Sequence, residues 1–449
     1  MSDSSINWNL IKIANAVQGE LVGEDKTING LSTDTRSCVE GELFVALQGP
    51  NFDGHNYVEQ AEKNGAIAIL VSKKISTSLP QIIVNDTRIA LGKLANAWRM
   101  QFDIPLIAIT GSNGKTTVKE ITTAILSQEH NVLATKGNFN NDIGVPLTLF
   151  GLNSGHSAAV IEMGANHPKE IEYLTHIAKP TVAIITNAGP AHLEGFGDIE
   201  GVARAKGEIY SGLSQNGTAI INNDDQYSEY WLSICKGVKT CTFGSVGEAD
   251  YLVRKENGHV LLTTPGETVN IDYYLPGEHN LLNAAAAAAA CSAAGVSIES
   301  IKNGLESMQA VSGRLQLKKG ISGSRIIDDT YNANPGSLKA ALQVLNEYPG
   351  THLLALGDMG ELGNAAEHSH TDAGKQARNS GVNKLYAIGQ FAQFSAQGFG
   401  EDSYVFEDQP SMISEIKNNL AEDVTLLVKG SRLMKMENIV NALAANGES

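Results

Sequence analysis

The residues best suited to chemistry in this sequence lie in the segment 104–117, which contains Thr-Gly-Ser-Asn-Gly-Lys-Thr-Thr at 110–117. An apolar run at 105–110 has strand character, a glycine turn follows, and Lys115 and Thr116 then open a segment with helical character. A strand, a glycine loop and a helix N-terminus in this order can hold a phosphate, because loop N–H groups and the positive helix end face the anion. Lys115 can reach the outer phosphates and the Thr116 hydroxyl can bind magnesium. The segment therefore predicts the use of ATP or GTP.

This loop is shorter than the common P-loop, which has a further glycine where this chain has Ile109. A turn that only links a strand to a helix is the alternative, but the Gly-Lys-Thr-Thr run at the helix start favours phosphate binding. The residues predicted to bind the phosphates are Gly111, Ser112, Asn113, Gly114, Lys115, Thr116 and Thr117.

Two other residues follow apolar strand candidates. Glu162 ends the run 158–162, and His192 follows the run 181–186. Ligands gather at the carboxyl ends of strands in open α/β sheets, so Glu162 is expected beside the phosphate loop as a magnesium ligand. A solvated glutamate is the alternative, and a lone histidine is more often structural or exposed than a ligand.

Two polar segments and one lysine remain ambiguous on residue type alone. The asparagine-rich segment 136–146 and the segment 328–335 could bind a base, a ribose, a phosphate or an amine, or could be turns that satisfy their own backbones. Composition alone predicts that Lys206 is a surface lysine.

Composition limits the class of protein. A chain of 449 residues suggests about three domains, and its net charge of −16 disfavours a nucleic-acid partner. The cysteines Cys38, Cys235, Cys241 and Cys291 form no CxxC pair, which favours free thiols in a reducing cytoplasm. Neither a signal peptide nor a run long enough to span a membrane is evident.

The elements that must position these residues fall into three units: 1–85, 86–312 and 313–449. Apolar strands alternate with helical stretches in the second unit and again in the third, which indicates an α/β fold with largely buried parallel sheets. Strands are predicted at 41–47 and 66–71; at 105–110, 131–135, 158–162, 181–186 and 218–222; and at 325–328, 352–356, 384–388 and 425–428. A β-rich excursion is expected at 250–274, followed by a helix that contains seven alanines at 284–290.

These motifs together resemble the Mur ligases, the ATP-dependent amide-forming enzymes of peptidoglycan precursor synthesis. The similarity covers the whole chain, and the asparagine-rich segment and Asp-Asp-Thr-Tyr-Asn-Ala-Asn-Pro are most similar to members that join D-alanyl-D-alanine to UDP-N-acetylmuramoyl-tripeptide. The matching motifs lie at 32–36, 41–47, 110–117, 137–146, 162–164, His192, 205–208, 279–283, 328–335, 356–363 and 428–432.

The resemblance implies a three-domain α/β architecture: a UDP-sugar domain at 1–85, a central P-loop ATPase domain with a parallel sheet at 86–312, and a Rossmann-like domain at 313–449 that closes over the site. By the same resemblance, Thr116 and Glu162 would bind one magnesium ion, and His192 and a carbamylated Lys206 would bind a second. Asn141, Asn283 and Arg314 would surround the adenine with Asp329 near the ribose, and Ser32 and Arg36 would hold the UDP-sugar.

In the implied reaction, ATP and Mg²⁺ convert the tripeptide carboxylate into an acyl phosphate. The amine of D-alanyl-D-alanine then attacks this acyl phosphate. The implied catalytic residues are Lys115, His192 and Lys206. The resemblance also implies a monomer in the cytoplasm. A folate-type glutamate ligase, a P-loop hydrolase or switch, and a regulatory nucleotide-binding protein are the alternatives.

Overall fold

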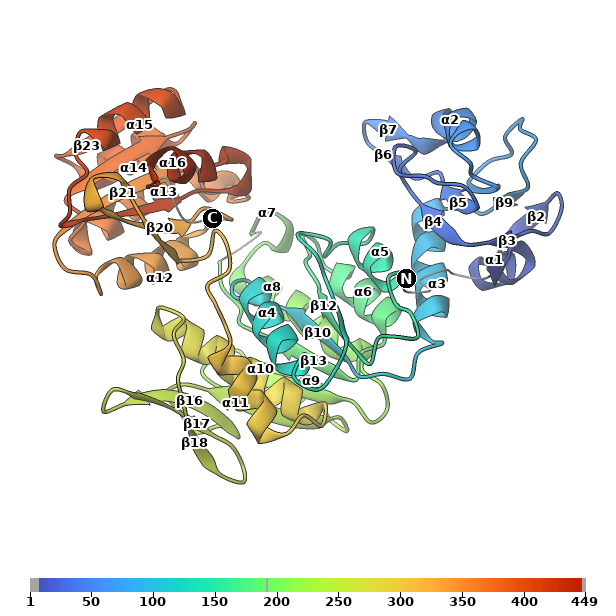
Figure 1. Ribbon diagram of the computed structural model, residues 1–449, viewed down its shortest axis with the longest axis horizontal. Coiled ribbons are helices and arrows are strands. Elements are labelled where there is room, and N and C mark those ends of the chain that lie inside the picture. The colour runs from blue at the N-terminus through green and yellow to red at the C-terminus, as the bar shows by residue number, and fades with distance from the viewer. Residues whose placement is uncertain (1–7, 191–192, 446–449) are drawn as a thin grey trace.

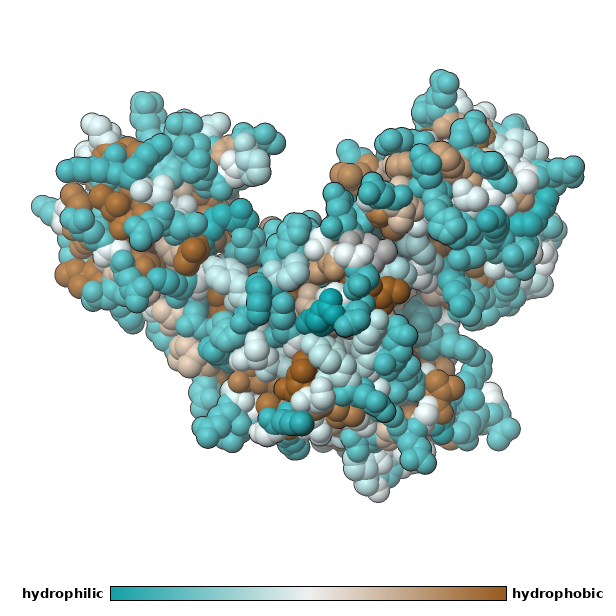
Figure 2. Space-filling model, turned by 180° about the vertical axis from the view of Figure 1, so that it is seen from behind, coloured by the Kyte–Doolittle hydropathy of each residue, from teal (hydrophilic) through white to brown (hydrophobic). Residues whose placement is uncertain are grey.

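The computed structural model describes residues 8–190 and 193–445, and it has three lobes, each built around its own sheet (Figure 1). The first and third lobes stand apart above the second, and the space-filling view shows the hollow between them (Figure 2). An α/β fold with largely parallel sheets was predicted, and this prediction is confirmed. Within the described residues, no helix is long and apolar enough to cross a membrane.

The first lobe has a five-stranded sheet in the order β2-β9-β8-β5-β4, in which only the β2–β9 pair is antiparallel. Its edge strand β2 is half exposed, whereas β8 in the middle is fully buried. The elements of this lobe are β1 (Trp8–Asn9), α1 (Leu10–Val17), β2 (Glu20–Val22), β3 (Thr27–Ile28), β4 (Gly30–Ser32), β5 (Glu42–Val45), β6 (Gln48–Gly49), β7 (Phe52–Asp53), α2 (Val58–Lys63), β8 (Ala68–Val71) and β9 (Gln81–Ile83). Helix α3 (Thr87–Arg99) follows and packs against both this lobe and the second.

The second lobe has a nine-stranded sheet in the order β11-β12-β10-β13-β14-β15-β16-β17-β18, parallel from β11 to β16 and antiparallel beyond. The parallel strands are β10 (Leu106–Thr110), β11 (Val132–Ala134), β12 (Ala158–Glu162), β13 (Val182–Ile185), β14 (Thr218–Asn222), β15 (Lys239–Gly244) and β16 (Tyr251–Glu256). The antiparallel edge, which is the predicted β-rich excursion, adds β17 (His259–Thr263) and β18 (Thr268–Ile271).

Helices cover both faces of this sheet, which is why its central strands are apolar throughout. The alanine run lies in α10 and is fully buried, because the small side chains let α10 approach α4 and the sheet closely. The helices are α4 (Lys115–Leu126), α5 (Gly144–Leu149), α6 (Glu170–Ala178), α7 (Leu193–Phe196), α8 (Ile199–Gly207), α9 (Ser228–Ile234), α10 (Glu278–Ala293) and α11 (Ile298–Glu306).

The third lobe has a six-stranded sheet in the order β19-β20-β24-β21-β22-β23, with β19 antiparallel and the other strands parallel. The last strand in the chain, β24, therefore lies near the middle of the sheet. The elements are β19 (Gln316–Lys319), β20 (Arg325–Asp329), α12 (Pro335–Leu345), β21 (Thr351–Gly357), α13 (Ala366–Asn379), β22 (Lys384–Ile388), α14 (Ala392–Phe399), β23 (Ser403–Phe406), α15 (Gln409–Lys417), β24 (Val424–Lys429) and α16 (Glu437–Leu443).

Candidate active site

The phosphate-loop candidate lies between β10 and α4, at the carboxyl end of the central sheet. Gly114 precedes the first residue of α4 with a φ of 81°, a left-handed conformation that glycine adopts without steric cost. A side chain there would also meet Asn283, since a Cβ on Gly114 would lie 2.6 Å from Asn283 Oδ1. The loop thus exposes backbone N–H groups at a helix start, the arrangement that binds phosphate.

The segment that follows the neighbouring strand β13 holds this loop in place. The Asn113 N–H donates to Asn187 Oδ1 at 3.0 Å, and Asn187 Nδ2 donates back to the Asn113 carbonyl at 3.1 Å. The Ser112 hydroxyl donates to the Gly189 carbonyl at 3.0 Å. Because β10 and β13 are paired in parallel, the residues after both strands meet at one edge of the sheet.

Lys115 folds back over its own loop. Its Nζ donates to the Gly111 carbonyl at 2.7 Å and to the Ser112 carbonyl at 3.4 Å. Burial lowers the pKa of Lys115, and the negative charge of Glu162 opposes this effect. The amine therefore lies over the loop, where it could reach an outer phosphate.

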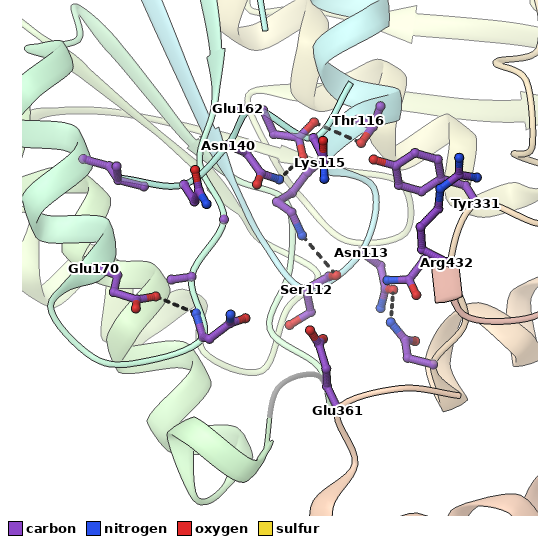
Figure 3. A pocket seen from close by; sticks show the side chains of 18 of the residues that line it. Ser112, Asn113, Lys115, Thr116, Asn140, Glu162, Glu170, Tyr331, Glu361 and Arg432 are labelled. Atoms are coloured by element: carbon purple, nitrogen blue, oxygen red, sulfur yellow. Dashed lines mark hydrogen bonds between the residues drawn. The ribbon is translucent and has the colours of Figure 1, made fainter. Parts of the chain in front are cut away.

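Glu162, Thr116 and Asn140 form the oxygen-rich centre of the site (Figure 3). The Thr116 hydroxyl donates to Glu162 Oε2 at 2.9 Å, and Asn140 Nδ2 donates to Glu162 Oε1 at 2.9 Å. Arg314 Nη2 donates to the same threonine hydroxyl at 2.9 Å. A hydroxyl and a carboxylate are the hard oxygen ligands that Mg²⁺ prefers, so this pair fits the predicted magnesium site. Within the described residues, however, no cluster of three or more His, Cys, Asp or Glu could hold a metal ion.

Lys206 is fully buried in α8, so the interpretation of this residue as a surface lysine, based on composition, is wrong. Its Nζ has no hydrogen-bond partner among the described residues and lies 5.4 Å from the centre of the Phe196 ring. Burial, reinforced by the positive charge of Lys115, lowers the pKa of Lys206 to about 7. An amine of this kind is uncharged in about half of the molecules at neutral pH, and the uncharged form can react as a nucleophile. The other predicted ligand of the second magnesium ion, His192, lies outside the described residues.

A cleft of 1220 Å³ joins the three lobes, and we call it the main cleft. Pro50 and Arg88 line it at the side of the first lobe, and the phosphate loop, Glu162 and α6 line its floor. The residues of the third lobe that line it are Asp329, Tyr331, Asn332, Asn334, Ser337, Glu361, Lys429 and Arg432. Because all three lobes supply walls, the chemistry of this cleft depends on how the lobes are arranged.

A second pocket of 260 Å³ lies on the other side of the phosphate loop, and we call it the small pocket. Asn283, Arg314, Asp329 and Thr117 line it, so the structure brings together three of the four residues that the resemblance placed at the nucleoside. The fourth, Asn141, lines the main cleft instead, where its side chain accepts the N–H groups of Ile143 and Gly144 at the start of α5.

Ser32 and Arg36 lie in the first lobe, and neither is among the described residues that line the two cavities. The Ser32 hydroxyl is buried and donates to the Asp34 carbonyl at 2.9 Å, while the exposed Arg36 side chain pairs with the Asp34 carboxylate. The structure therefore does not bring this pair to the phosphate loop, and their predicted contact with the UDP-sugar stays a prediction.

Sequence reasoning missed most of the third lobe's contribution to the site. Arg314 lies 4.2 Å above the centre of the Tyr331 ring, and Asn334 Nδ2 donates to Asn113 Oδ1 at 2.8 Å, which joins the third lobe to the phosphate loop. Lys429 is fully buried and donates to Asp329 and to the Asn332 carbonyl. The signal was present in the segments 328–335 and 428–432, whose residue types suit ligands but do not reveal their targets.

Comparisons with known proteins agree with this geometry. Three family models match in order along the chain: "Mur ligase family, catalytic domain" at 27–99, "Mur ligase middle domain" at 109–291 and "Mur ligase, glutamate ligase domain" at 313–432. The chain belongs to the Mur ligase family. The predicted three-domain Mur ligase architecture is thereby confirmed.

The most informative relatives match the chain over nearly its whole length. The UDP-N-acetylmuramoyl-tripeptide–D-alanyl-D-alanine ligase of Escherichia coli K12 is 44% identical over 98% of this chain and 99% of its own. A crystal structure of MurF from Acinetobacter baumannii, 36% identical, superposes with a TM-score of 0.92 over 98% of this chain and 99% of that one. The MurF ligase of Thermotoga maritima in complex with ADP, 28% identical, gives a TM-score of 0.82 over 92% of this chain and 96% of that one.

Proposed function

We propose that this Mur ligase uses ATP to join D-alanyl-D-alanine to UDP-N-acetylmuramoyl-tripeptide in the synthesis of peptidoglycan precursors. The observation that carries the proposal is the main cleft, in which a phosphate loop, a carboxylate–hydroxyl pair and a third-lobe wall of polar groups meet. Full-length similarity to ligases named for this reaction supports the same assignment.

The phosphate loop would hold the β- and γ-phosphates of ATP through its N–H groups, with the Lys115 amine on the outer phosphates. The small pocket would receive the nucleoside, with Asn283 and Arg314 around the adenine and Asp329 near the ribose. Asn141, which the resemblance placed at the adenine, would instead act from the main cleft.

In the proposed reaction, the free carboxylate of the tripeptide attacks the γ-phosphorus in line, which forms an acyl phosphate and releases ADP. The amine of the dipeptide then attacks the acyl carbon, and inorganic phosphate leaves as the amide forms. Two anions must approach each other in the first step, so the positive charge of Lys115 stabilises the transition state. A site enclosed by three lobes would also keep water away from the acyl phosphate.

Magnesium fits the proposed site through Thr116 and Glu162, with His192 and Lys206 as the proposed ligands of a second ion. When bound, Mg²⁺ would neutralise part of the negative charge on the triphosphate. The lysine must first become an anion: its uncharged amine adds to carbon dioxide and loses a proton, which gives a carbamate. The buried Nζ and the lowered pKa of Lys206 favour that reaction.

We further propose that the residue ranges 1–85, 86–312 and 313–449 are the functional domains, and that Ser32 and Arg36 contact the UDP-sugar on the first of them. The matched family segments at 27–99, 109–291 and 313–432 support the second boundary most closely. The enzyme would act as a monomer in the cytoplasm.

Magnesium-dependent ADP release tests the function, with ATP, UDP-N-acetylmuramoyl-tripeptide and D-alanyl-D-alanine supplied together and each omitted in turn. We expect release to require all three and the product mass to be that of the pentapeptide. ADP release from ATP alone would instead indicate a hydrolase, and release that depends on a folate and glutamate would indicate a folate-type ligase.

A further inference from the structure

Two oppositely charged side chains from the third lobe face the main cleft and have no role in the phosphate chemistry above. Glu361 follows β21 and Arg432 follows β24, and both line the main cleft. These two strands are direct neighbours in the sheet, so the loops after them leave the same edge side by side. The close view shows Glu361 reaching toward Ser112, while Arg432 lies beside Tyr331 (Figure 3).

The two loops touch at the residues immediately before the charged ones. A Cβ on Gly360 would lie 3.6 Å from Ser431 Cβ, and the Ser431 N–H donates to the Asp358 carbonyl at 2.8 Å. Glu361 and Arg432 therefore project from two backbones that are in contact. A carboxylate and a guanidinium on adjoining loops of the cleft suit a short ligand with a positive group at one end and a negative group at the other.

The loop that carries Glu361 is firmly anchored on both sides. Met359 and Leu362 are buried, and the Met359 N–H donates to His370 Nε2 at 2.9 Å. The Asp358 carboxylate accepts the N–H groups of Gln390 and Phe391 at 2.7 and 3.0 Å. Such anchoring places the exposed carboxylate of Glu361 at a defined position in the cleft.

Glu361 itself adopts a φ of 62°, in the left-handed region that glycine would occupy without steric cost. Strained backbone held by its surroundings is typical of residues that bind ligands. Glu361 lines the main cleft together with Lys115, and its negative charge acts against the lowering of the pKa of Lys115 and of Lys206 by burial.

The Arg432 side chain is positioned by two contacts within the third lobe. Its Nη1 donates to Glu437 Oε1 at 3.0 Å, and its guanidinium carbon lies 6.0 Å from the centre of the Tyr331 ring. These contacts leave the rest of the planar donor group for a carboxylate, which arginine binds through two parallel hydrogen bonds.

We propose that Glu361 binds the ammonium group, and Arg432 the carboxylate, of the acceptor dipeptide. This inference rests on the proposed function, because D-alanyl-D-alanine is the zwitterion that the reaction must place beside the acyl phosphate. The subsite would bring the amine toward the phosphate-loop end of the cleft and keep the carboxylate at its outer wall.

The test compares the effects of variants on each substrate separately, after the wild-type enzyme has been shown to form the pentapeptide. In Glu361→Gln the KM for the dipeptide should rise about 10- to 150-fold, the factor expected when a hydrogen bond to a charged group is lost. The KM for ATP should change far less than the KM for the dipeptide. Acyl phosphate formation, followed by positional oxygen exchange in labelled ATP without the dipeptide, should also continue.

Ligand analogues then identify which charge each residue binds. Propionyl-D-alanine, which lacks the ammonium group, should inhibit the wild type and Glu361→Gln equally. D-alanyl-D-alaninamide, which lacks the carboxylate, should have the same KM as the dipeptide in Arg432→Gln but a much higher KM in the wild type. Glu401→Gln and Lys417→Gln, on exposed positions of the same lobe, serve as charge-removal controls.

Glu361→Gly provides a second variant, since it removes the carboxylate and relieves the left-handed backbone. An unchanged dipeptide KM in both Glu361 variants, or a parallel rise in the KM for ATP, would overturn the assignment of the ammonium site. An Arg432→Gln enzyme that still prefers the acid to the amide would overturn the assignment of the carboxylate site. Failure of the wild type to make the pentapeptide would refute the proposed function instead.

Discussion

The hydrogen bond between Thr116 and Glu162 joins the phosphate loop to the strand beside it and fixes the proposed magnesium ligands. We expect Thr116→Val and Glu162→Gln to lower kcat by about 100- to 1000-fold, since each removes one preorganised polar contact with the reacting phosphates. Their melting temperatures should fall far less than their rates. The measurement is kcat against magnesium concentration, with Glu401→Gln as control, and near-normal rates at limiting magnesium would contradict the assignment.

Lys206 combines full burial with an amine that lacks a hydrogen-bond partner in the described part of the chain. If it carries a carbamate, Lys206→Ala should lose nearly all activity, and a short carboxylate or bicarbonate added to the assay should restore part of it. Turnover with and without acetate gives the readout. An inactive variant that no small anion restores would favour a structural role for this lysine.

His279, in the wall of the small pocket, should make stability depend on pH. Burial lowers its pKa below the ordinary value of 6.5, an effect that Lys429 reinforces and Asp329 opposes. Between the lowered pKa and 6.5 the unfolded chain binds a proton that the folded protein does not, so the stability present above 6.5 is lost as the pH falls. Denaturant unfolding from pH 5 to 8 should show this loss in the wild type and a smaller one in His279→Gln.

At the scale of elements, α13 and α14 approach closely because each has a glycine at the contact. A Cβ on Gly374 would clash with the Ser395 carbonyl oxygen, and one on Gly398 with the Thr371 carbonyl oxygen. Gly374→Ala should therefore lower the free energy of unfolding by about 1–3 kcal/mol, although alanine favours a helix. Thermal unfolding tests this, with Gly266→Ala as the matched control, since a Cβ at Gly266 meets nothing within 4 Å.

Most of the strands that sequence reasoning located are buried along their length, and the partly buried edge strand β11 is the exception. The five strands predicted between 105 and 222 all occur. Each is a short continuous apolar run, a pattern that is typical of a buried strand. Strand β23 was missed, since it is a short edge strand of two exposed and two half-buried residues that carry no such pattern. The helix with the alanine run was predicted, although its bounds, Glu278–Ala293, required the structure.

The parts of the site that could be predicted follow directly after strands. The position of Glu162 beside the phosphate loop was predicted because both follow apolar strands, and the structure shows that β10 and β12 are adjacent parallel strands that end together. Tyr331, Glu361 and Arg432 could not be placed in this way, since their approach to the phosphate loop depends on how the third lobe packs on the second. Local spacing carries no information about that packing.

For the whole molecule, the separation of the first and third lobes predicts a change of shape on ligand binding (Figure 2). The residues that would enclose the reacting groups come from all three lobes, so the cleft should close when both ATP and the UDP-linked tripeptide are bound. Small-angle X-ray scattering should show a lower radius of gyration with both ligands than with neither. Lys115→Ala should show a much smaller decrease, whereas an equal decrease in this variant would contradict nucleotide-dependent closure.

The order of strands along the chain has a consequence for synthesis on the ribosome. Each large sheet is made from one continuous stretch of sequence, so the lobes can fold one after another as they emerge. Strand β24 is the last to be made, yet it lies between β20 and β21 in its sheet. A nascent chain that ends before Val424 therefore has a complete phosphate loop but lacks both the central strand of its third sheet and Arg432. The capacity to form the amide bond should thus appear only when the polypeptide is almost finished.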